Sequence, residues 1–436
     1  MTSESALAER LSRMIRIPTV ADRGDEPFEA FVSLLDELYP RIRASLQRET
    51  ISDRGLLYRW PGASSADPLV LMAHYDVVPA NPDEWDDDPF DGRISDGWVH
   101  GRGALDDKGP LLVILEAVEI LLDQGFSPAR DVYLSFGGNE ETYGGGARTI
   151  ALTLRDRGVR PWLVIDEGGA VVDAPLPFTR GRAAMIGVGE KGLLTLRLDA
   201  ASDPGHASAP RGASAIDRLA RATARLGPRT FRPRAPRAIT GMLASLAATA
   251  RGPAKALYRL LSRSGWLTGR VFAALGGEPA ALVRTTIAAT MQSGGSAPNV
   301  LPAEASVRFN LRIIPGETVE GVTRRVNRRI ADAKVTATVE EASEPTRLSP
   351  VDGAPFAAIA AAVGTALPGA VPTPYLMMQA SDARYFHDIS EHVYRFAPLE
   401  MSAEQRASIH GVGERVEIAS LVRGRDFHVA LIRGLE

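Results

Sequence analysis

Three short apolar runs end abruptly in polar, Gly-rich segments, and this pattern limits the possible folds more than any other feature. The runs are "PLVLMAHYD", "DVYLSFGGNEE" and "PWLVIDEGG". Amphipathic helical stretches lie between them, and "GPLLVILEAVEILLDQG" carries apolar residues around much of its circumference, as a helix packed on a sheet would. Short apolar runs alternating with helical segments are typical of buried parallel strands that are covered by helices. The sequence therefore predicts an α/β fold for this part of the chain.

The pattern changes from about residue 190. Strands are predicted at "LLTLRLDA", "RTTIAATMQ", "EASVRFNLRII" and "KVTATVEEA", and helices at "SAIDRLARATARL" and "TVEGVTRRVNRRIADA". Their order along the chain is β-α-β-β-α-β, which is the order of a ferredoxin-like unit. We therefore expect an α+β domain that is inserted into the α/β domain.

A chain of 436 residues exceeds what one hydrophobic core usually serves, so two domains are expected. The α/β domain is predicted to comprise residues 1–187 and 346–436, and the inserted domain residues 188–345. Between the first helix and second strand of the inserted domain lies an extra segment, about 228–282. That segment is predicted to be helical, and the sequence does not indicate its role.

Composition disfavours several classes of partner and restricts the residue types of a metal site. The formal net charge of -3 gives no reason to expect nucleic acid or an anionic membrane as a partner, and no apolar run is long enough to span a bilayer. The N-terminus lacks the apolar core of a signal peptide, so a cytoplasmic location is expected. The chain has no cysteine, so a metal site would have to use His, Asp and Glu.

Residues able to bind metal follow the predicted strands. They form four pairs: His74 with Asp76, Asp106 with Asp107, Glu140 with Glu141, and Asp166 with Glu167. Each pair alone has a simpler interpretation as a turn or a helix cap. In open α/β sheets, however, such segments meet beyond the carboxyl ends of the strands, where unpaired carboxylates would repel one another. Two divalent cations would remove this repulsion, with one carboxylate bridging them.

His74 and Asp76 fit such a site by their spacing. A histidine that binds metal through one ring nitrogen usually donates from the other to an oxygen that fixes its orientation. We therefore expect His74 to be a ligand and Asp76 to orient it.

Seven motifs together resemble family 20 of the metallopeptidases. They are "AHYDVVPA", "GRGALDDKG", "GGNEE", "DEGG", "GHASAP", "APNVLPAEASVRFNLRIIPGE" and "IHGVGERV", and they run through nearly the whole chain in the family's order. This family contains dinuclear zinc hydrolases such as aminoacylase and succinyl-diaminopimelate desuccinylase. The chain looks most similar to its carboxypeptidase S and N-acyl amino acid hydrolase branch. The resemblance implies a zinc-exopeptidase-like α/β catalytic domain with an inserted ferredoxin-like lid and dimerisation domain.

The resemblance implies two zinc ions per chain, with cobalt or manganese as possible substitutes. His74, Asp106 and Glu167 would hold one ion, and Asp106, Glu141 and His410 the other, so that Asp106 bridges them. Glu140 matches the family's general base, and the peptide bond between Asp106 and Asp107 is expected to be cis.

Further residues are implied to bind substrate. His206 matches a histidine that relatives supply across a dimer interface to polarise the substrate carbonyl, so a homodimer through the inserted domain is expected. Asn299 and Arg312 match substrate-anchoring positions, and Ser381 and Arg384 lie in a segment that resembles the wall of the substrate pocket. His100, His387, His392 and His428 belong to no motif and are expected to be structural or exposed.

Three functions remain open. The favoured one is a carboxypeptidase or dipeptidase that acts on small peptides with a free C-terminal carboxylate, with Glu140 as general base. The alternative is an amidohydrolase that removes the acyl group of N-acyl amino acids. The third is a catalytically silent binding protein, which the complete ligand set and Glu140 disfavour.

Overall fold

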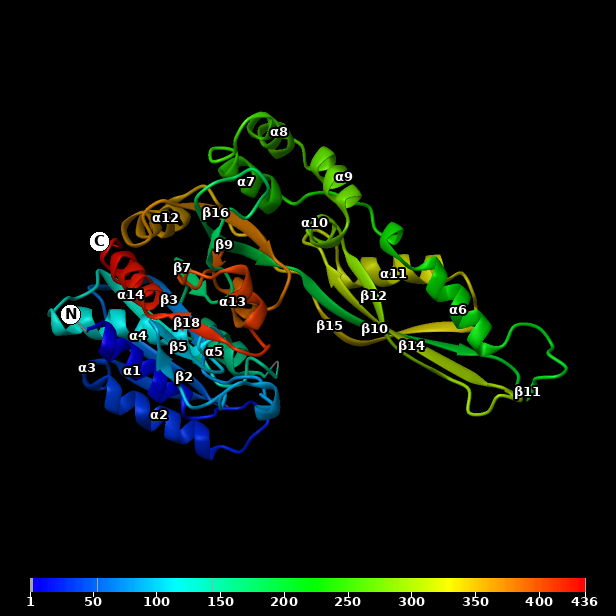
Figure 1. Cartoon of the computed structure of the whole chain (residues 1–436), viewed down its shortest axis with the longest axis horizontal. Helices are drawn as coiled ribbons and strands as arrows, with labels where there is room; N and C mark the ends of the chain where they lie inside the picture. Colours follow the sequence, from blue (N-terminus) through cyan, green and yellow to red (C-terminus); the bar gives the residue numbers. More distant parts are fainter. Residues whose placement is uncertain (1–2, 53, 143, 436) are drawn as a thin grey trace.

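The computed structural model describes residues 3–52, 54–142 and 144–435. Its largest sheet is mixed, and parallel strands form its centre. In spatial order the strands are β1 (Gln47–Ile51), β2 (Gly55–Trp60), β6 (Arg130–Gly137), β3 (Ser64–His74), β7 (Leu163–Asp166), β17 (Val393–Arg395), β9 (Arg182–Glu190) and β16 (Ala370–Met377), with β8 (Val171–Asp173) beside β9. The chain thus forms the predicted α/β sheet from both of its ends (Figure 1).

Helices cover both faces of this sheet because its central strands are apolar on both sides. In β3, Leu69 and Leu71 face one hydrophobic core, while Val70 and Met72 face another. The larger core includes α1 (Glu4–Ile15), α2 (Glu26–Leu38), α3 (Pro40–Ser45), α4 (Lys108–Asp123), α12 (Ala354–Ala366) and α14 (Ile418–Arg433). The smaller core includes α5 (Gly146–Asp156) and the 3-10 helix η3 (Asp382–Asp388).

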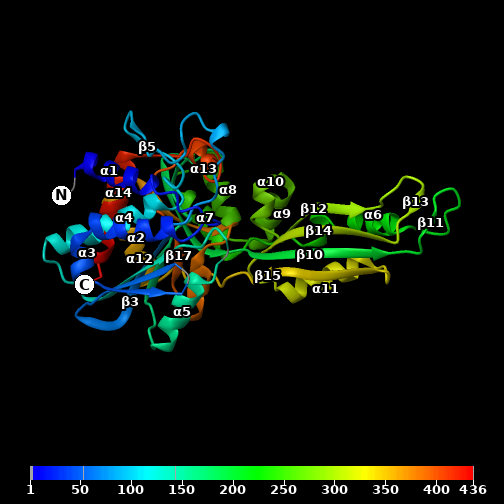
Figure 2. The same cartoon turned by 90° about the horizontal axis from the view of Figure 1, so that it is seen from below.

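A second, antiparallel sheet has its own core and extends away from the first (Figures 1 and 2). Its strand order is β12 (Thr286–Gly294), β14 (Glu304–Ile313), β10 (Gly192–Ala201) and β15 (Val335–Ser343), with α6 (Ala215–Arg225) and α11 (Val319–Ile330) packed on it. Alternate residues of β14 are buried, which is the pattern of a sheet with only one covered face. The predicted β-α-β-β-α-β order is present, and we call the strands β10, β12, β14 and β15 together with α6 and α11 the four-stranded unit.

Three smaller groups of elements complete the fold. One is the three-stranded sheet of β18 (Arg415–Glu417), β5 (Trp98–His100) and β4 (Ile94–Ser95), and another is the pair β11 (Gly205–His206) and β13 (Val300–Leu301) at the tip of the four-stranded unit. Short helices are η1 (Pro82–Glu84), η2 (Pro228–Thr230) and α13 (Ala403–Ser408). None of the helices in the described part of the chain is long and apolar enough to cross a lipid bilayer.

The extra segment 228–282 forms α7 (Arg237–Leu246), α8 (Pro253–Ser262), α9 (Gly265–Leu275) and α10 (Gly277–Ala281). It interrupts the four-stranded unit in sequence, but its apolar residues join the larger core of the α/β part. Ile239 and Leu243 of α7 and Tyr258 of α8 belong to that core, and Gly241 approaches Pro374 of β16. Figure 1 accordingly shows α7 and α8 above β9 and β16.

Candidate functional site

The candidate site lies at the carboxyl ends of three adjacent parallel strands, β6, β3 and β7. His74 is the last residue of β3, and Asp166 is the last residue of β7. Glu140 and Glu141 follow the end of β6 at Gly137. The structure therefore brings together segments that are far apart in the sequence at the edge where the sequence predicts them.

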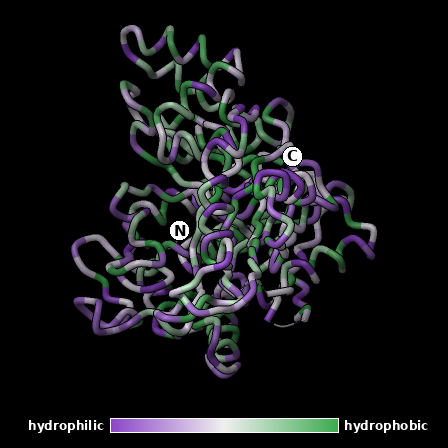
Figure 3. The backbone as a smooth tube through the Cα atoms, turned by 90° about the vertical axis from the view of Figure 1, so that its right-hand side faces the viewer, coloured by the Kyte–Doolittle hydropathy of each residue, from purple (hydrophilic) through white to green (hydrophobic). Residues whose placement is uncertain are grey.

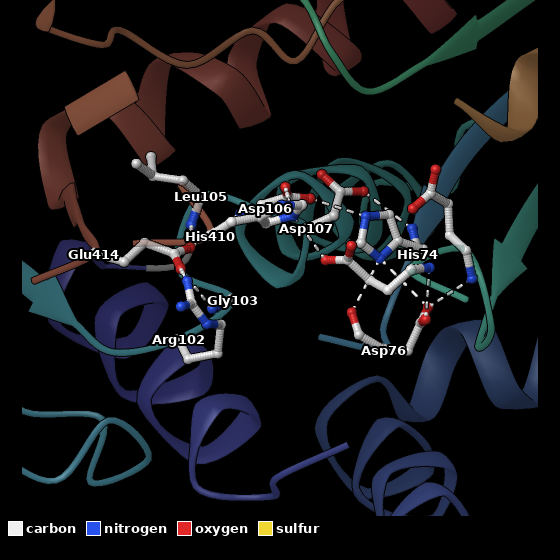
Figure 4. Close-up of polar contacts among 11 residues, drawn as sticks. His74, Asp76, Arg102, Gly103, Leu105, Asp106, Asp107, His410 and Glu414 are labelled. Carbon is white, nitrogen blue, oxygen red and sulfur yellow. Dashed lines mark hydrogen bonds and ion pairs between the residues drawn. The ribbon is translucent and has the colours of Figure 1, made fainter. Parts of the chain in front are cut away.

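Asp106 presents one carboxylate oxygen to each of two histidines. Its Oδ1 lies 2.9 Å from His74 Nε2, and its Oδ2 lies 3.0 Å from His410 Nε2. His410 Nε2 also lies 3.1 Å from Glu141 Oε1. His74 is buried, whereas about half of the His410 side chain is exposed. Figure 4 shows Asp106 between the two rings, so that one carboxylate faces both histidines.

Asp76 is fully buried and supports the site in two ways. Its backbone carbonyl oxygen lies 3.0 Å from His74 Nδ1, and its carboxylate oxygen Oδ1 lies 3.4 Å from the same nitrogen. The carboxylate also accepts hydrogen bonds from the backbone N–H groups of Glu140, at 3.1 Å, and Glu141, at 3.0 Å. Asp76 thus leaves Nε2 of His74 free to face Asp106, and it fixes the turn that carries both glutamates.

The carboxylates of the site are close enough to perturb one another. Burial, together with neighbouring acids, raises the pKa values of Glu167 and Glu140 well above their usual range. Burial also raises the pKa of Asp106, but hydrogen bonds from His410 and His74 outweigh it and hold that pKa below its usual range. The same type of hydrogen bond, with Asp106 and Glu141, raises the pKa of His410 to about 10. A cation among these side chains would relieve the repulsion.

The donor set suits divalent cations. Ligand atoms of His74, Asp106 and Glu141 all lie within 4.8 Å of one another, and so do those of Asp106, Asp107 and Glu167. Around a tetrahedral zinc ion, bonds of about 2.0–2.1 Å place neighbouring ligand atoms about 3.3 Å apart. The separations of 2.9–3.1 Å at Asp106 and Glu141 are near that value. Two groups that share Asp106 are therefore available.

Glu414 and Arg102 hold the Asp106 segment in place, and neither residue was predicted from the sequence. The carboxylate of Glu414 is buried, pairs with Arg102 at 2.5 Å and accepts hydrogen bonds from the N–H groups of Gly103, Leu105 and Asp106. Figure 4 shows this cluster beside His410. A signal was present, because Glu414 lies in "IHGVGERV" only four residues after His410.

Asp107 also has a role that the sequence did not indicate. Its buried carboxylate accepts a hydrogen bond of 3.0 Å from the backbone N–H of His74, which joins the Asp106 segment to the end of β3. The peptide bond between Asp106 and Asp107 is cis, as predicted.

Ser381 and Arg384 lie in a buried polar cluster at the junction of the two sheets. The hydroxyl of Ser381 donates to Glu190 at 2.8 Å, and Arg384 pairs with the same carboxylate at 3.0 Å. Arg395, which is fully buried, pairs with Glu190 at 2.6 Å. Arg384 also donates to the hydroxyl of Ser343, the last residue of β15 in the four-stranded unit. Both predicted substrate contacts thus bind Glu190 in this structure.

His206, Asn299 and Arg312 lie in the four-stranded unit and its tip. His206 is exposed in β11, and the backbone oxygen of Asn299 accepts a hydrogen bond from Ala207. Arg312 lies in β14 opposite Leu193, near the connection between the two sheets. Figure 1 shows β11 at the end of the molecule farthest from the α/β sheet, so one chain alone does not bring His206 to the metal-binding groups.

In the described part of the chain, the four histidines outside the motifs belong to neither group of possible metal ligands. Burial lowers the pKa of His387 to about 2 and that of His428 to about 3. His100 lies 3.2 Å from the hydroxyl of Ser95, and His392 is half-buried after η3.

Comparisons with known proteins agree with this geometry. The family model described as Peptidase family M20/M25/M40 matches residues 70–434. A probable carboxypeptidase S-like 2 of Dictyostelium discoideum is 31% identical, and the alignment covers 100% of this chain and 86% of the relative. The N-fatty-acyl-amino acid synthase/hydrolase PM20D1.1 of Danio rerio is 34% identical, with 94% of this chain and 82% of the relative covered.

A solved structure shows the same fold. An M20 family metallo-carboxypeptidase, Sso-CP2 of Sulfolobus solfataricus, superimposes with a TM-score of 0.68 at 18% identity, covering 99% of both chains. The predicted α/β fold class is therefore confirmed. Because the family model spans most of the chain and the relatives align over nearly all of it, this protein belongs to peptidase family M20/M25/M40, a family of metal-dependent hydrolases.

Proposed function

We propose that this protein hydrolyses the peptide bond of small substrates with a free carboxylate, as a carboxypeptidase or dipeptidase assisted by two divalent cations. The observation that carries the proposal is the position of Asp106, whose two oxygens face His74 and His410 separately. A carboxylate in this position could serve as a ligand to each of two ions, as carboxylates do in two-metal hydrolytic sites.

The ligands proposed for one ion are His74, Asp106 and Glu167. Those proposed for the other are Asp106, Glu141 and His410. When bound, the ions supply Lewis-acid activation of water and of the substrate carbonyl. Zinc suits a set of imidazole and carboxylate donors, and cobalt or manganese can occupy the same kind of site.

Glu140 is the proposed general base. Its backbone is fixed by Asp76, and its half-buried side chain lies close enough to His74, Asp106 and Asp382 for their charges to affect its pKa. Burial raises the pKa of Glu140. A raised pKa makes the carboxylate a stronger base, so Glu140 can take a proton from water and then give it to the leaving amine.

Arg312 is the proposed anchor for the substrate carboxylate. Among the described residues it has no ion pair, whereas Arg384 is already bound to Glu190. A guanidinium group without a carboxylate partner can bind a substrate carboxylate through two parallel hydrogen bonds. We assign Asn299 to the same anchoring role, and Ser381 and Arg384 to the wall of the pocket.

The four-stranded unit is proposed to act as a lid and as the dimer interface. β12 is an edge strand, and Ala288–Gly294 are exposed along it, so it can pair with a second copy of itself. A homodimer would also explain the exposed position of His206, which we propose completes the site of the partner subunit and polarises the substrate carbonyl. The cytoplasmic location stays a prediction, which cell fractionation would test.

A second candidate activity is hydrolysis of N-acyl amino acids. It is favoured by the relative from Danio rerio, whose name describes an N-fatty-acyl-amino acid synthase/hydrolase and which is 34% identical. The same ions, general base and carboxylate anchor would serve either reaction, because both substrates present an amide bond near a free carboxylate.

The test combines metal content with product analysis. Protein purified without chelator is expected to contain about two divalent ions per chain. It should cleave members of a dipeptide panel, lose this activity after chelation and regain it with zinc. Cleavage restricted to an N-acyl amino acid panel would support the second candidate instead. Metal-free protein without turnover on either panel, before or after addition of zinc, would contradict both.

A further inference from the structure

The helical segment 228–282 carries a concentrated positive charge. It contains nine Lys or Arg residues and one acid, Glu278, although the whole chain has a formal net charge of -3. The chain-wide value gives no reason to expect an anionic partner, but it hides this local surplus. Interactions with a charged surface depend on local rather than total charge, because salt screens charges beyond about 8–10 Å.

The segment is held firmly against the body of the protein. One face of α7 is buried in the larger core, and the hydroxyl of Tyr258 in α8 donates to the carbonyl oxygen of Pro177 at 2.5 Å. At its other end, the buried ammonium group of Lys191 donates to the carbonyl oxygen of Ala281 at 3.0 Å. With their inner faces fixed in this way, α8 and α9 present a defined outer face.

Large apolar side chains are exposed on this segment and beside it. Leu257 and Leu260 lie three residues apart in α8, and 55% of Leu260 is exposed. In α9, 62% of Trp266 is exposed. Phe178 is 74% exposed, and its backbone oxygen accepts a hydrogen bond from Arg251 just before α8. In Figure 3 the uppermost coils alternate between hydrophobic and hydrophilic colours.

A cavity of about 790 Å³ opens between α9 and the chain that leads into α7. We call it the arginine cavity, because its wall includes four arginines together with one tryptophan: Arg232, Arg234, Arg237, Arg270 and Trp266. Its lining contains no acid, and among the described residues none of these arginines is in an ion pair. The guanidinium of Arg270 lies 5.0 Å from the ring centre of Trp266. Exposed guanidinium groups without carboxylate partners are suited to bind phosphate groups.

We propose that α8 and α9 dock this protein on the surface of a membrane that contains anionic phospholipids. Lipid phosphates would occupy the arginine cavity, while Leu257, Leu260 and Trp266 enter the interface between headgroups and acyl chains. A basic, partly apolar helical surface binds anionic membranes in this way without crossing them. Nucleic acid would match the charge, but exposed leucines add nothing to contacts with a sugar-phosphate backbone, so lipid fits both features better.

Sedimentation with vesicles tests this proposal on the metal-loaded, full-length protein. The protein should sediment with vesicles of phosphatidylcholine and phosphatidylglycerol, and not with phosphatidylcholine alone. The double variant Arg234→Glu/Arg270→Glu should weaken binding by about tenfold or more, because it reverses charge next to the lipid phosphates. The variant Leu260→Ser/Trp266→Ser should also weaken binding, although it leaves the charge unchanged.

A matched control reverses two exposed arginines elsewhere, Arg23→Glu and Arg328→Glu, and it should bind vesicles as the wild type does. Thermal melting of each variant shows whether the fold is retained. No sedimentation of the wild type, or equal loss in the control, would overturn the proposal. The proposal would also be overturned if the Leu260→Ser/Trp266→Ser variant bound vesicles as strongly as the wild type and the protein bound duplex DNA tightly. That result would indicate a general site for polyanions. Binding of inorganic phosphate at constant ionic strength, without any vesicle binding, would show a site for the free ion only and would also overturn the proposal.

Discussion

At the scale of single residues, Glu140 and Glu141 show how neighbouring glutamates can take different roles. Both backbone N–H groups bind the carboxylate of Asp76, but only Glu141 contacts His410. We expect Glu140→Ala to retain both metal ions and to lower kcat by about a thousandfold, within the usual contribution of a general base. Metal analysis and steady-state kinetics on the same preparation check this.

The control for that variant is Glu391→Ala, which removes an exposed glutamate after η3 and should leave kcat unchanged. Wild-type activity of Glu140→Ala would remove Glu140 from the reaction. Loss of metal in Glu140→Ala would instead make Glu140 a ligand.

The pKa values of the site predict that metal binding releases protons. Hydrogen bonds with Asp106 and Glu141 raise the pKa of His410 to about 10, and burial raises the pKa of Glu167. At pH 7 the metal-free site therefore holds protons that the cations must displace, so affinity should fall as the pH is lowered. Calorimetric titration with zinc in buffers of different ionisation enthalpy should show at least one proton released. Heats that are independent of the buffer would contradict this.

At the scale of structural elements, the loop between β5 and α4 depends on one buried ion pair. Glu414 accepts from Arg102 and from three backbone N–H groups, including that of Asp106. We expect Glu414→Ala to reduce the free energy of unfolding by about 3–5 kcal/mol, because it leaves a buried guanidinium without its partner. Urea unfolding measures this loss, and metal content shows whether Asp106 is still in place.

A nearby surface pair provides the control. Arg415 pairs with Glu404 at 2.9 Å, and 77% of the Glu404 side chain is exposed. Glu404→Ala should lower the free energy of unfolding by no more than about 1 kcal/mol, because exposed ion pairs contribute little. Equal effects of the two substitutions would show that the Glu414 pair has no special importance for the loop.

Elements that follow from local sequence pattern could be predicted, and those that depend on distant pairing could not. The strand ends at His74 and Asp166 were predictable because apolar runs stop there and parallel strands end at one edge. The partners of Glu414 and Glu190 were not, since Arg102 lies 312 residues from Glu414 and Arg395 lies 205 from Glu190. No local period marks a buried charge whose partner is so distant.

At the scale of the whole molecule, sequence order and spatial packing differ for the helices of segment 228–282. They interrupt the four-stranded unit in the chain, yet Ile239 and Tyr258 are part of the core of the α/β sheet. The sequence could indicate that the segment is helical and apolar, because this depends on local pattern. It could not indicate which core receives the apolar face, because both neighbouring sheets present apolar surfaces.

The exposed position of His206 at the far tip leads to a prediction about the assembly. If His206 completes the site of the partner subunit, His206→Ala should lower turnover strongly while both metal ions remain bound. The two inactive variants should also rescue each other, because a dimer of Glu140→Ala with His206→Ala has one site with both residues intact. Random exchange between equal amounts of the two should restore about a quarter of wild-type activity, given C2 symmetry. Mixed samples that stay inactive after verified subunit exchange would show that His206 does not act on the site of the partner subunit. Loss of zinc in the His206→Ala variant would instead show that His206 is a metal ligand.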